Sequence, residues 1–321
     1  MQYNPLGADH LALSESEDAA LHRFLELFRL VDETPAERTR RFTVRDFQDE
    51  VRQEARRLVG RASECATLAE ALAATAAGVL WVWGAAGVGK SCLLAWLTAH
   101  PLAAPPPDTL VLSYRFRVGD ERCNRETFLR FAGERLMAWL QLPDDPSAET
   151  MPPLRRLRET LARLGGKRVL FVLDGLDEIA AFDPRFAVEV PLALAGPGIV
   201  WLCAGRPEAG LPVAFAGARQ PFPVGVPGMS EGDIRSLLLE RIGPLRQHLL
   251  RHDREQGERV GNPFVEQVAR AADGLPLYVD YVIKDIFAGL YRVLDGYGRL
   301  KIRRDSNLGW NTGINNCKSN C

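Results

Sequence analysis

The 321-residue sequence is notable first for what it has little of. Its six cysteines form no Cys-x-x-Cys pair and its five histidines have no metal-ligand spacing, which argues against a disulfide framework and a zinc site. We therefore expect reduced thiols in a cytoplasmic protein. Net charge is also nearly absent, since 40 basic residues balance 41 acidic ones. This balance gives no reason to expect nucleic acid or an anionic membrane as a partner.

Long hydrophobic runs are scarce as well. The uncharged stretch 71–89 has nearly the length of a membrane span, but only residues 79–83 are strongly apolar, so we expect no span. The first 22 residues contain four acidic residues and no apolar segment, and we expect no signal peptide there. With 46% hydrophobic and 25% charged residues, the composition is that of an ordinary globular protein.

What the sequence does contain, from residue 58 to 226, is an alternation of apolar strands and helices. The expected strands are 78–83, 109–116, 168–173 and 198–204. The expected helices between them are 91–100, 126–142 and 153–164. The strands are continuously apolar, as in a parallel sheet covered on both faces. We predict an α/β domain with a doubly wound, mostly parallel sheet, residues 58–226.

The regions that flank this domain differ from it. Residues 1–57 are polar and helical, and they suit a small helical unit or a linker. Residues 227–297 are predicted to form a small helical domain. Its expected helices are 230–242, 262–272 and 275–290, the first opened by a Ser230 cap.

The last residues, 298–321, have a different composition. Asn occurs three times in the first 300 residues and five times between positions 307 and 320, while Ala is absent from residue 301 on. We interpret this segment as a disordered tail of different origin, from a shifted reading frame or a truncated domain. An ordinary polar tail is the alternative interpretation.

The strongest motif, residues 84–91, matches Gly-x-x-x-x-Gly-Lys-Ser in full and lies between an expected strand and an expected helix. Its glycines let the backbone wrap around phosphates, and the helix start adds a positive dipole end. We expect the Lys90 ammonium to neutralise phosphates and the Ser91 hydroxyl to bind Mg²⁺. The expected phosphate-binding residues are Gly84, Ala85, Ala86, Gly87, Val88, Gly89, Lys90, Ser91 and Cys92. The motif indicates a P-loop NTPase.

A second motif, residues 169–178, ends an apolar strand in several carboxylates. Asp174 lies at the carboxyl end of that strand, where open α/β sheets bind ligands, and is expected to hold Mg²⁺ opposite Ser91. We expect Glu178 to act as the base that orients the attacking water, with Asp177 as its substitute. An acidic, solvated turn is the alternative interpretation.

These residues resemble the STAND class of signal-transduction NTPases, and within it the NACHT group, in which the Asp-Gly-Leu-Asp-Glu of residues 174–178 is typical. The resemblance covers residues 58–290. It implies that Val59 and Gly60 lie beside the adenine and that Pro276 touches it. It also implies that Arg206, in the segment Leu202–Pro207, reads the γ-phosphate. The winged-helix domain and the repeat array of that class are not recognisable in the sequence.

The resemblance implies ATP or ADP and Mg²⁺ as cofactors, and a switch in signalling that hydrolyses ATP slowly. It further implies a homo-oligomer on ATP binding and an unidentified protein partner. The absence of an Asn-Lys-x-Asp element favours ATP over GTP. A fragment that binds nucleotide or a partner without turnover is the alternative, and a P-loop kinase is a third. We expect Arg115 and Arg117 to lie in a solvated, charged loop, and an approach of Arg115 to phosphate is the alternative interpretation.

Overall fold

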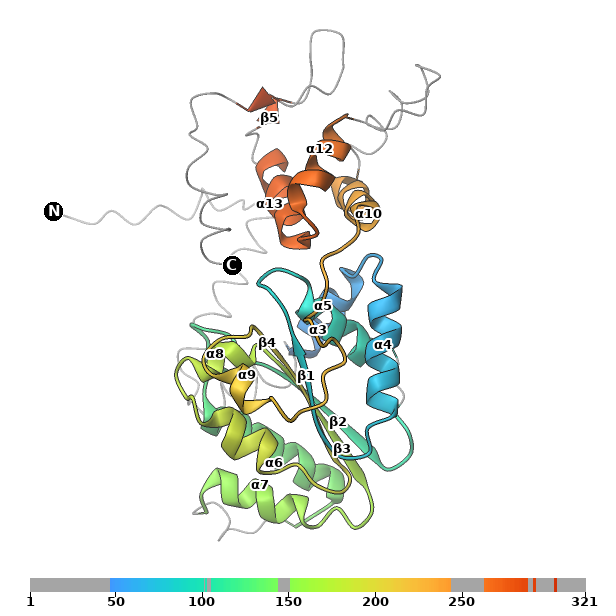
Figure 1. Ribbon diagram of the computed structural model, residues 1–321. Helices are drawn as coiled ribbons and strands as arrows, with labels where there is room; N and C mark the ends of the chain where they lie inside the picture. The colour runs from blue at the N-terminus through green and yellow to red at the C-terminus, as the bar shows by residue number, and fades with distance from the viewer. Residues whose placement is uncertain are drawn as a thin grey trace, which may run out of the picture. The chain divides into compact units, whose positions relative to one another are not determined.

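The computed structural model describes residues 47–100, 102, 105–143, 151–243, 263–287, 291–292 and 303–304 (Figure 1). The chain divides into two compact units, residues 1–47 and 48–321. Phe47 is the one residue of the first unit that the structure describes. The helical region expected before residue 47 and nearly all of the expected tail lie outside the described residues.

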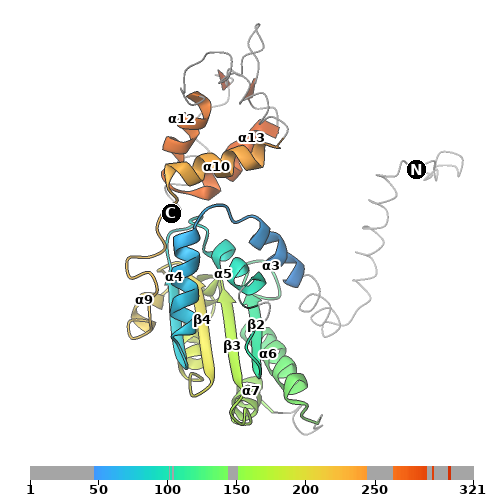
Figure 2. The same ribbon diagram turned by 90° about the vertical axis from the view of Figure 1, so that its right-hand side faces the viewer.

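Four parallel strands form the central sheet in the order β1-β4-β3-β2. They are β1 (Gly78–Trp83), β2 (Thr109–Arg115), β3 (Arg168–Asp174) and β4 (Ile199–Gly205). Figure 2 shows β4, β3 and β2 side by side and pointing the same way. Every residue of β4 is buried, and every residue of β3 after the first. The predicted doubly wound, parallel α/β fold is confirmed, and each strand begins and ends within one residue of its expected position.

Helices cover both faces of this sheet (Figure 1). One face packs against α6 (Arg125–Leu140) and α7 (Pro153–Leu161) through an aromatic core, in which Phe171 stacks on Trp201 with ring centroids 3.9 Å apart. The other face packs against α4 (Ala62–Ala73) and α5 (Lys90–Ala99). The helix α4 is not among the predicted ones, because many of its apolar residues are small alanines that give weak periodicity.

Short helical segments complete this domain. They are α8 (Leu176–Ala180), the π-helical turn η4 (Val188–Leu192) and α9 (Leu211–Ala214). The helix α3 (Phe47–Arg56) precedes the domain in sequence. A further backbone segment extends the sheet next to β1, where the Trp81 amide donates to the Arg219 carbonyl at 2.8 Å and the Arg219 amide donates to the Val79 carbonyl at 3.0 Å. The strand β1 therefore has neighbours on both sides.

Helices follow in the region where a small helical domain is expected. They are α10 (Glu231–Ile242), α12 (Pro263–Ala272) and α13 (Pro276–Phe287), which share a core of their own. The predicted cap is present, because the Ser230 hydroxyl accepts a hydrogen bond from the Asp233 amide at 3.0 Å. Two-residue strands, β5 (Tyr291–Arg292) and β6 (Arg303–Arg304), pair in antiparallel fashion. None of the helices in the described part of the chain is long and apolar enough to span a membrane.

Candidate functional site

The loop between β1 and α5 has the conformation that its glycines allow. Gly87 and Gly89 have φ angles of 71° and 100°, which are left-handed values that other residues adopt rarely. Gly89 is also the residue before α5, so the loop ends at the amino terminus of that helix. Backbone amides in such a loop and at a helix start form an anion-binding concavity. The geometry suits the phosphates of a nucleotide.

Lys90 folds back over this loop. Its Nζ donates hydrogen bonds to the carbonyl oxygens of Gly84 at 2.8 Å and Ala85 at 2.9 Å. Burial lowers the pKa of the Lys90 ammonium, while the charges of Asp177 and Asp174 oppose that change. The ammonium is therefore held at the loop and faces the carboxylates that end β3. Ser91 follows it in the first turn of α5.

Asp174 ends β3, and its carboxylate has a cationic partner. Arg115, the last residue of β2, is aligned with Asp174 in the strand register, and its Nε donates to Asp174 Oδ2 at 2.6 Å. The expectation that Arg115 lies in a solvated loop is wrong, since its side chain is only 16% exposed. Arg117 fits that expectation better, with a side chain that is 62% exposed.

Asp177 and Arg206 form a pair at the end of β4. Asp177 is buried, and its carboxylate accepts from Arg206 Nε at 2.6 Å and from the Arg206 amide at 2.9 Å. Both of its oxygens are therefore engaged. In this arrangement Asp177 anchors Arg206 and the chain that leaves β4, whereas the sequence predicts separate roles for the two residues.

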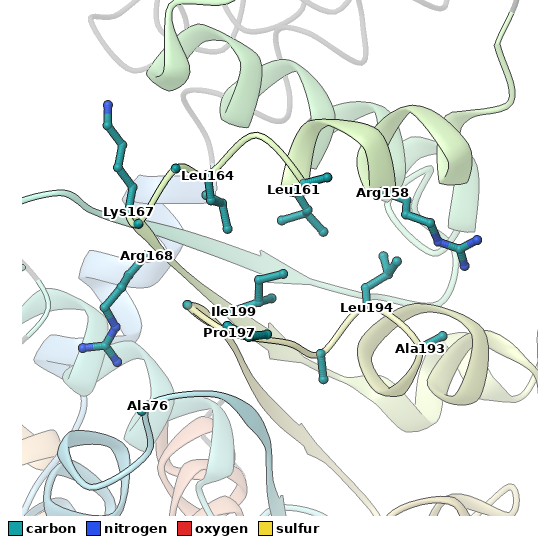
Figure 3. A pocket seen from close by; sticks show the side chains of 15 residues that line it. Ala76, Arg158, Leu161, Leu164, Lys167, Arg168, Ala193, Leu194, Pro197 and Ile199 are labelled. Carbon is teal, nitrogen blue, oxygen red and sulfur yellow. The ribbon is translucent and has the colours of Figure 1, made fainter.

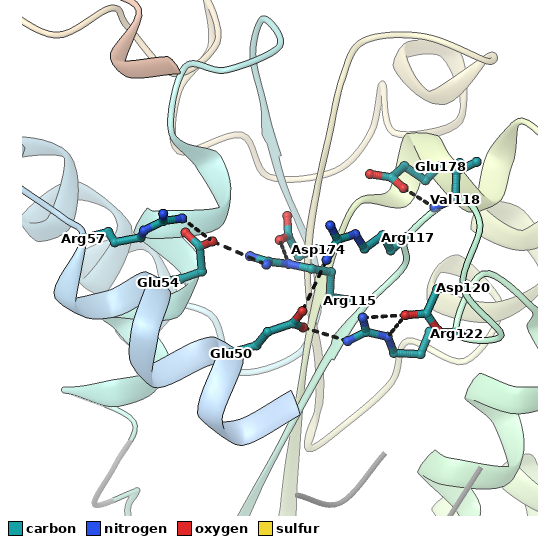
Figure 4. A network of polar contacts seen from close by, with 10 residues as sticks. All are labelled: Glu50, Glu54, Arg57, Arg115, Arg117, Val118, Asp120, Arg122, Asp174 and Glu178. Atoms are coloured by element: carbon teal, nitrogen blue, oxygen red, sulfur yellow. Dashed lines mark hydrogen bonds and ion pairs between the residues drawn. The ribbon is translucent and has the colours of Figure 1, made fainter. Parts of the chain in front are cut away.

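Glu178 lies one residue further along α8. Its Oε2 accepts a hydrogen bond from the Val118 amide at 2.5 Å, and its Oε1 has no hydrogen-bond partner among the described residues (Figure 4). Burial raises the pKa of the Glu178 carboxyl, the Val118 bond lowers it, and the nearby Asp177 and Asp174 charges raise it further. Of the two carboxylates, Glu178 is the one with an oxygen available to a water molecule.

The residues expected around the adenine also come together. A cleft of about 60 Å³ is lined by Val59, Gly89, Cys92 and Pro276, among others. Small-molecule sites usually measure roughly 300–1,000 Å³, so this cleft is smaller than a typical ligand site. Gly60 lies against Asp233 of α10, since a Cβ on Gly60 would come within 2.3 Å of Asp233 Oδ1.

The start of α13 lies directly on the P-loop. A Cβ on Gly87 would meet the Leu277 Cβ at 2.6 Å, and one on Gly89 would meet the Pro276 Cγ at 3.7 Å. Any group bound in the loop is thus close to this helix.

Two further residues contribute to the site without having been predicted as functional residues from the sequence. Arg61 is only 3% exposed, and its guanidinium donates to the carbonyls of Val88 and Pro227, both at 2.6 Å. It thereby joins the P-loop to the segment that leads into α10. Glu54 of α3 reaches the site as well, since Cys92 Sγ donates to its Oε2 at 3.1 Å. The one sequence signal that points to Arg61 is its position directly after Val59 and Gly60, which the resemblance places beside the adenine.

A larger hollow lies elsewhere. A cavity of about 760 Å³ borders the starts of β3 and β4, at the opposite end of the strands from the P-loop (Figure 3). Its lining is largely apolar and includes Leu161, Leu194 and Ile199. Because open α/β sheets bind ligands at the carboxyl ends of their strands, the smaller cleft at the P-loop is the candidate site.

Comparison with known proteins agrees with this geometry. Residues 57–187 match the family model described as AAA ATPase domain. The match includes the P-loop, Asp174 and Glu178, and it ends before Arg206 and the helical domain. The chain therefore contains an ATPase-like P-loop domain, while the finer resemblance to the NACHT group stays a prediction. No curated protein sequence matches the chain.

Similar solved structures are distant. A Walker-type ATPase of Pyrococcus abyssi is 17% identical, with 72% of this chain and 69% of that chain covered and a TM-score of 0.40. The Aeropyrum pernix Orc1 protein, solved in complex with DNA, is 18% identical, with 67% and 65% covered and a TM-score of 0.35. This chain thus spans less than two thirds of that Orc1 chain. Neither likeness carries an argument about function.

The donor groups at the site fit magnesium and a nucleotide. The Ser91 hydroxyl and the Asp174 carboxylate supply hard oxygen donors, which Mg²⁺ prefers. No group of three or more His, Cys, Asp or Glu residues in the described part of the chain could hold a metal ion by itself. Mg²⁺ commonly uses one or two protein ligands together with phosphate oxygens and water.

Proposed function

We propose that the chain binds Mg²⁺-ATP at the P-loop and acts as a nucleotide-dependent switch with slow hydrolysis. The observation that carries this proposal is the contact of Pro276 and Leu277 with the loop glycines. Because α13 starts on the loop, a phosphate chain bound there interacts with the helical domain. The equilibrium between two arrangements of the P-loop and these helices shifts only as far as the nucleotide binds one arrangement more tightly than the other.

The roles proposed for individual residues follow from their surroundings. Lys90 exchanges its two loop carbonyls for phosphate oxygens, and Ser91 and Asp174 hold the metal ion. Bound Mg²⁺ would supply neutralisation of the phosphate charge. Glu178 Oε1 orients a water molecule and accepts its proton. Arg206 is the proposed γ-phosphate contact of the resemblance, and in this role it has to leave Asp177.

The connection between the two domains supports the switch. The Met229 amide donates to the Gly274 carbonyl at 2.8 Å, and a Cβ on Gly274 would lie 2.9 Å from the Gly228 Cα. The backbones of two glycines thus lie against each other, Gly228 just before α10 and Gly274 between α12 and α13. Since neither carries a side chain, a change of angle at this point disturbs little packing. Homo-oligomerisation on ATP binding and an unidentified protein partner belong to the same proposal.

A binding module without turnover is the second candidate. The observation in its favour is that Asp177 is fully engaged by Arg206 and that Glu178 is tied to the Val118 amide. Hydrolysis requires Glu178 Oε1 to reach the reacting water and Arg206 to leave Asp177 for the γ-phosphate. If Arg206 stays on Asp177 in the bound state, nucleotide binding alone remains.

Calorimetry with purified protein and Mg²⁺-ATP tests the binding step. We expect micromolar or tighter binding to the wild type and its loss in Lys90→Ala. Lys167→Ala is a matched control, because this substitution removes the same charge at the opposite ends of the strands from the P-loop. There the Lys167 Nζ lies 4.9 Å from the centroid of the Trp139 ring. Equal binding by wild type and Lys90→Ala would contradict the proposed site.

A single-turnover assay separates the two candidates. With protein in excess over radiolabelled ATP, the switch predicts slow phosphate release by the wild type and a loss of about 10²-fold or more in Glu178→Gln. No release from either protein, with binding intact in both, would favour the binding module.

A further inference from the structure

Arg115 has more hydrogen-bond donors than partners. Its guanidinium carries five N–H donors, and only Nε is used, on Asp174 Oδ2. The nearest second acid is Glu54 of α3, whose Oε1 lies 3.9 Å from the Arg115 terminal nitrogen Nη1 (Figure 4). No hydrogen-bond acceptor among the described residues engages either terminal nitrogen. The two terminal nitrogens are therefore available to a ligand that offers acceptors, and a charged donor of this kind suits the oxygens of a phosphate.

We propose that Arg115 reads the γ-phosphate at this site and that Glu54 of α3 competes for it while the γ-phosphate is absent. This inference rests on the proposed function and assigns a residue that neither the motifs nor the family resemblance single out. It concerns the choice between ATP and ADP, which a switch must make.

The position of Arg115 supports this role. It ends the strand next to β3, in register with Asp174, so its side chain emerges at the carboxyl edge of the sheet, where the P-loop also lies. Its planar fork suits bidentate binding of phosphate oxygens. Arg206, the other candidate for this role, already commits its Nε and its backbone amide to Asp177.

The charges around Arg115 determine which anion it pairs with in each nucleotide state. In the present conformation Asp174 attracts the guanidinium most strongly, at 2.6 Å. Once Asp174 holds a divalent cation, its negative charge is compensated and its attraction for Arg115 falls. Arg115 then pairs with the nearest remaining anion. That anion is the γ-phosphate when ATP is bound and Glu54 when ADP is bound.

Because Glu54 belongs to α3, the partner that Arg115 pairs with affects how this helix is held. This helix is held to the ATPase-like domain by polar contacts that include Glu54 with Cys92, at 3.1 Å, and Glu50 with Arg122, at 2.7 Å. Pairing of Arg115 with the γ-phosphate takes the guanidinium away from this helix. The docking of α3 is therefore expected to differ between the two nucleotide states.

The test compares two affinities in each variant. Titration calorimetry with Mg²⁺ gives the dissociation constants of ADP and of a non-hydrolysable ATP analogue. Arg115→Gln should weaken the analogue by roughly tenfold or more and ADP by less than about threefold, because one charge-assisted phosphate contact is lost. Arg115→Lys keeps the charge without the fork and should fall in between. Arg117→Gln, an exposed arginine two residues away, should change neither constant.

Glu54→Gln should act in the opposite direction and only through Arg115. It removes the competing charge, so the analogue should bind a few times more tightly relative to ADP. In the Arg115→Gln background the same substitution should have no effect on that ratio. An effect that persists there overturns the role of Glu54, and equal weakening of both nucleotides in Arg115→Gln and Arg115→Lys overturns that of Arg115.

The two proposals fail in distinguishable ways. If the wild type binds both nucleotides with the same affinity, the γ-phosphate reader is refuted while nucleotide binding stands. If the wild type binds neither, both proposals are refuted. Thermal unfolding of every variant checks that a loss of affinity does not come from loss of the fold.

Discussion

Arg61 offers the most direct test of how the P-loop is held in place. We predict that Arg61→Met destabilises the domain and loosens the loop. The guanidinium donates to the buried carbonyl of Val88 and to the carbonyl of Pro227, both at 2.6 Å, and it pairs with Glu64 at 3.1 Å. Methionine keeps an apolar stem of similar length and makes none of these bonds.

The magnitude follows from the groups left behind. A buried carbonyl without a partner costs about 1–3 kcal/mol, and the Pro227 carbonyl, at an exposed residue, costs about 1 kcal/mol because water replaces part of its bond. We expect Arg61→Met to lower the free energy of unfolding by roughly 2–4 kcal/mol. The left-handed backbone of residue 61, with φ at 62°, is present in both proteins and cancels in the comparison.

Guanidinium chloride denaturation followed by tryptophan fluorescence measures this difference. Arg57→Met is the matched control, because Arg57 is 50% exposed and pairs with Glu54 only at 3.4 Å, a contact of at most about 1 kcal/mol. We also expect Arg61→Met to bind ADP more weakly than the control does. A loss of stability in Arg61→Met no larger than that in Arg57→Met would refute the reasoning.

Two further predictions concern the base and a helix cap. Burial is the main cause that raises the pKa of Glu178 above its usual 4.5, so proton acceptance requires a higher pH than for a free carboxyl. The single-turnover rate should therefore fall as the pH is lowered through that raised pKa and level off above it, whereas a rate independent of pH from 5 to 8 in both wild type and Glu178→Gln would exclude Glu178 as the base. Ser230→Ala removes the cap of α10 and should cost about 1 kcal/mol of stability; Ser236→Ala, a serine within the same helix whose hydroxyl bonds to the Gly232 carbonyl, should cost less.

The sheet was predictable because three of its strands, β1, β3 and β4, are largely buried on both faces. Such strands appear in the sequence as continuous apolar runs, and their ends were predicted to within one residue. The P-loop is equally local, since its glycines, Lys90 and Ser91 are adjacent in the chain. The helix α4 is different, because its alanines pack well but give little periodic signal.

The electrostatic partners of the site could not be predicted from local sequence. Arg115 pairs with Asp174 across 59 positions, and Asp177 pairs with Arg206 across 29. These pairs follow from the strand order, which brings β2 next to β3 and β4 next to β3. A charged residue at a strand end has the same appearance in sequence whether it faces water or a neighbouring carboxylate. The expectation of a solvated Arg115 was wrong for this reason.

The crossing of Gly228 and Gly274 bears on how the protein tolerates sequence change. At this point a single methyl group would act as a wedge, since a Cβ on Gly274 would come within 2.9 Å of the opposite backbone. Each domain has its own core and would stay folded around such a wedge. Substitution of either glycine is therefore expected to alter communication between the domains before it alters the architecture of either.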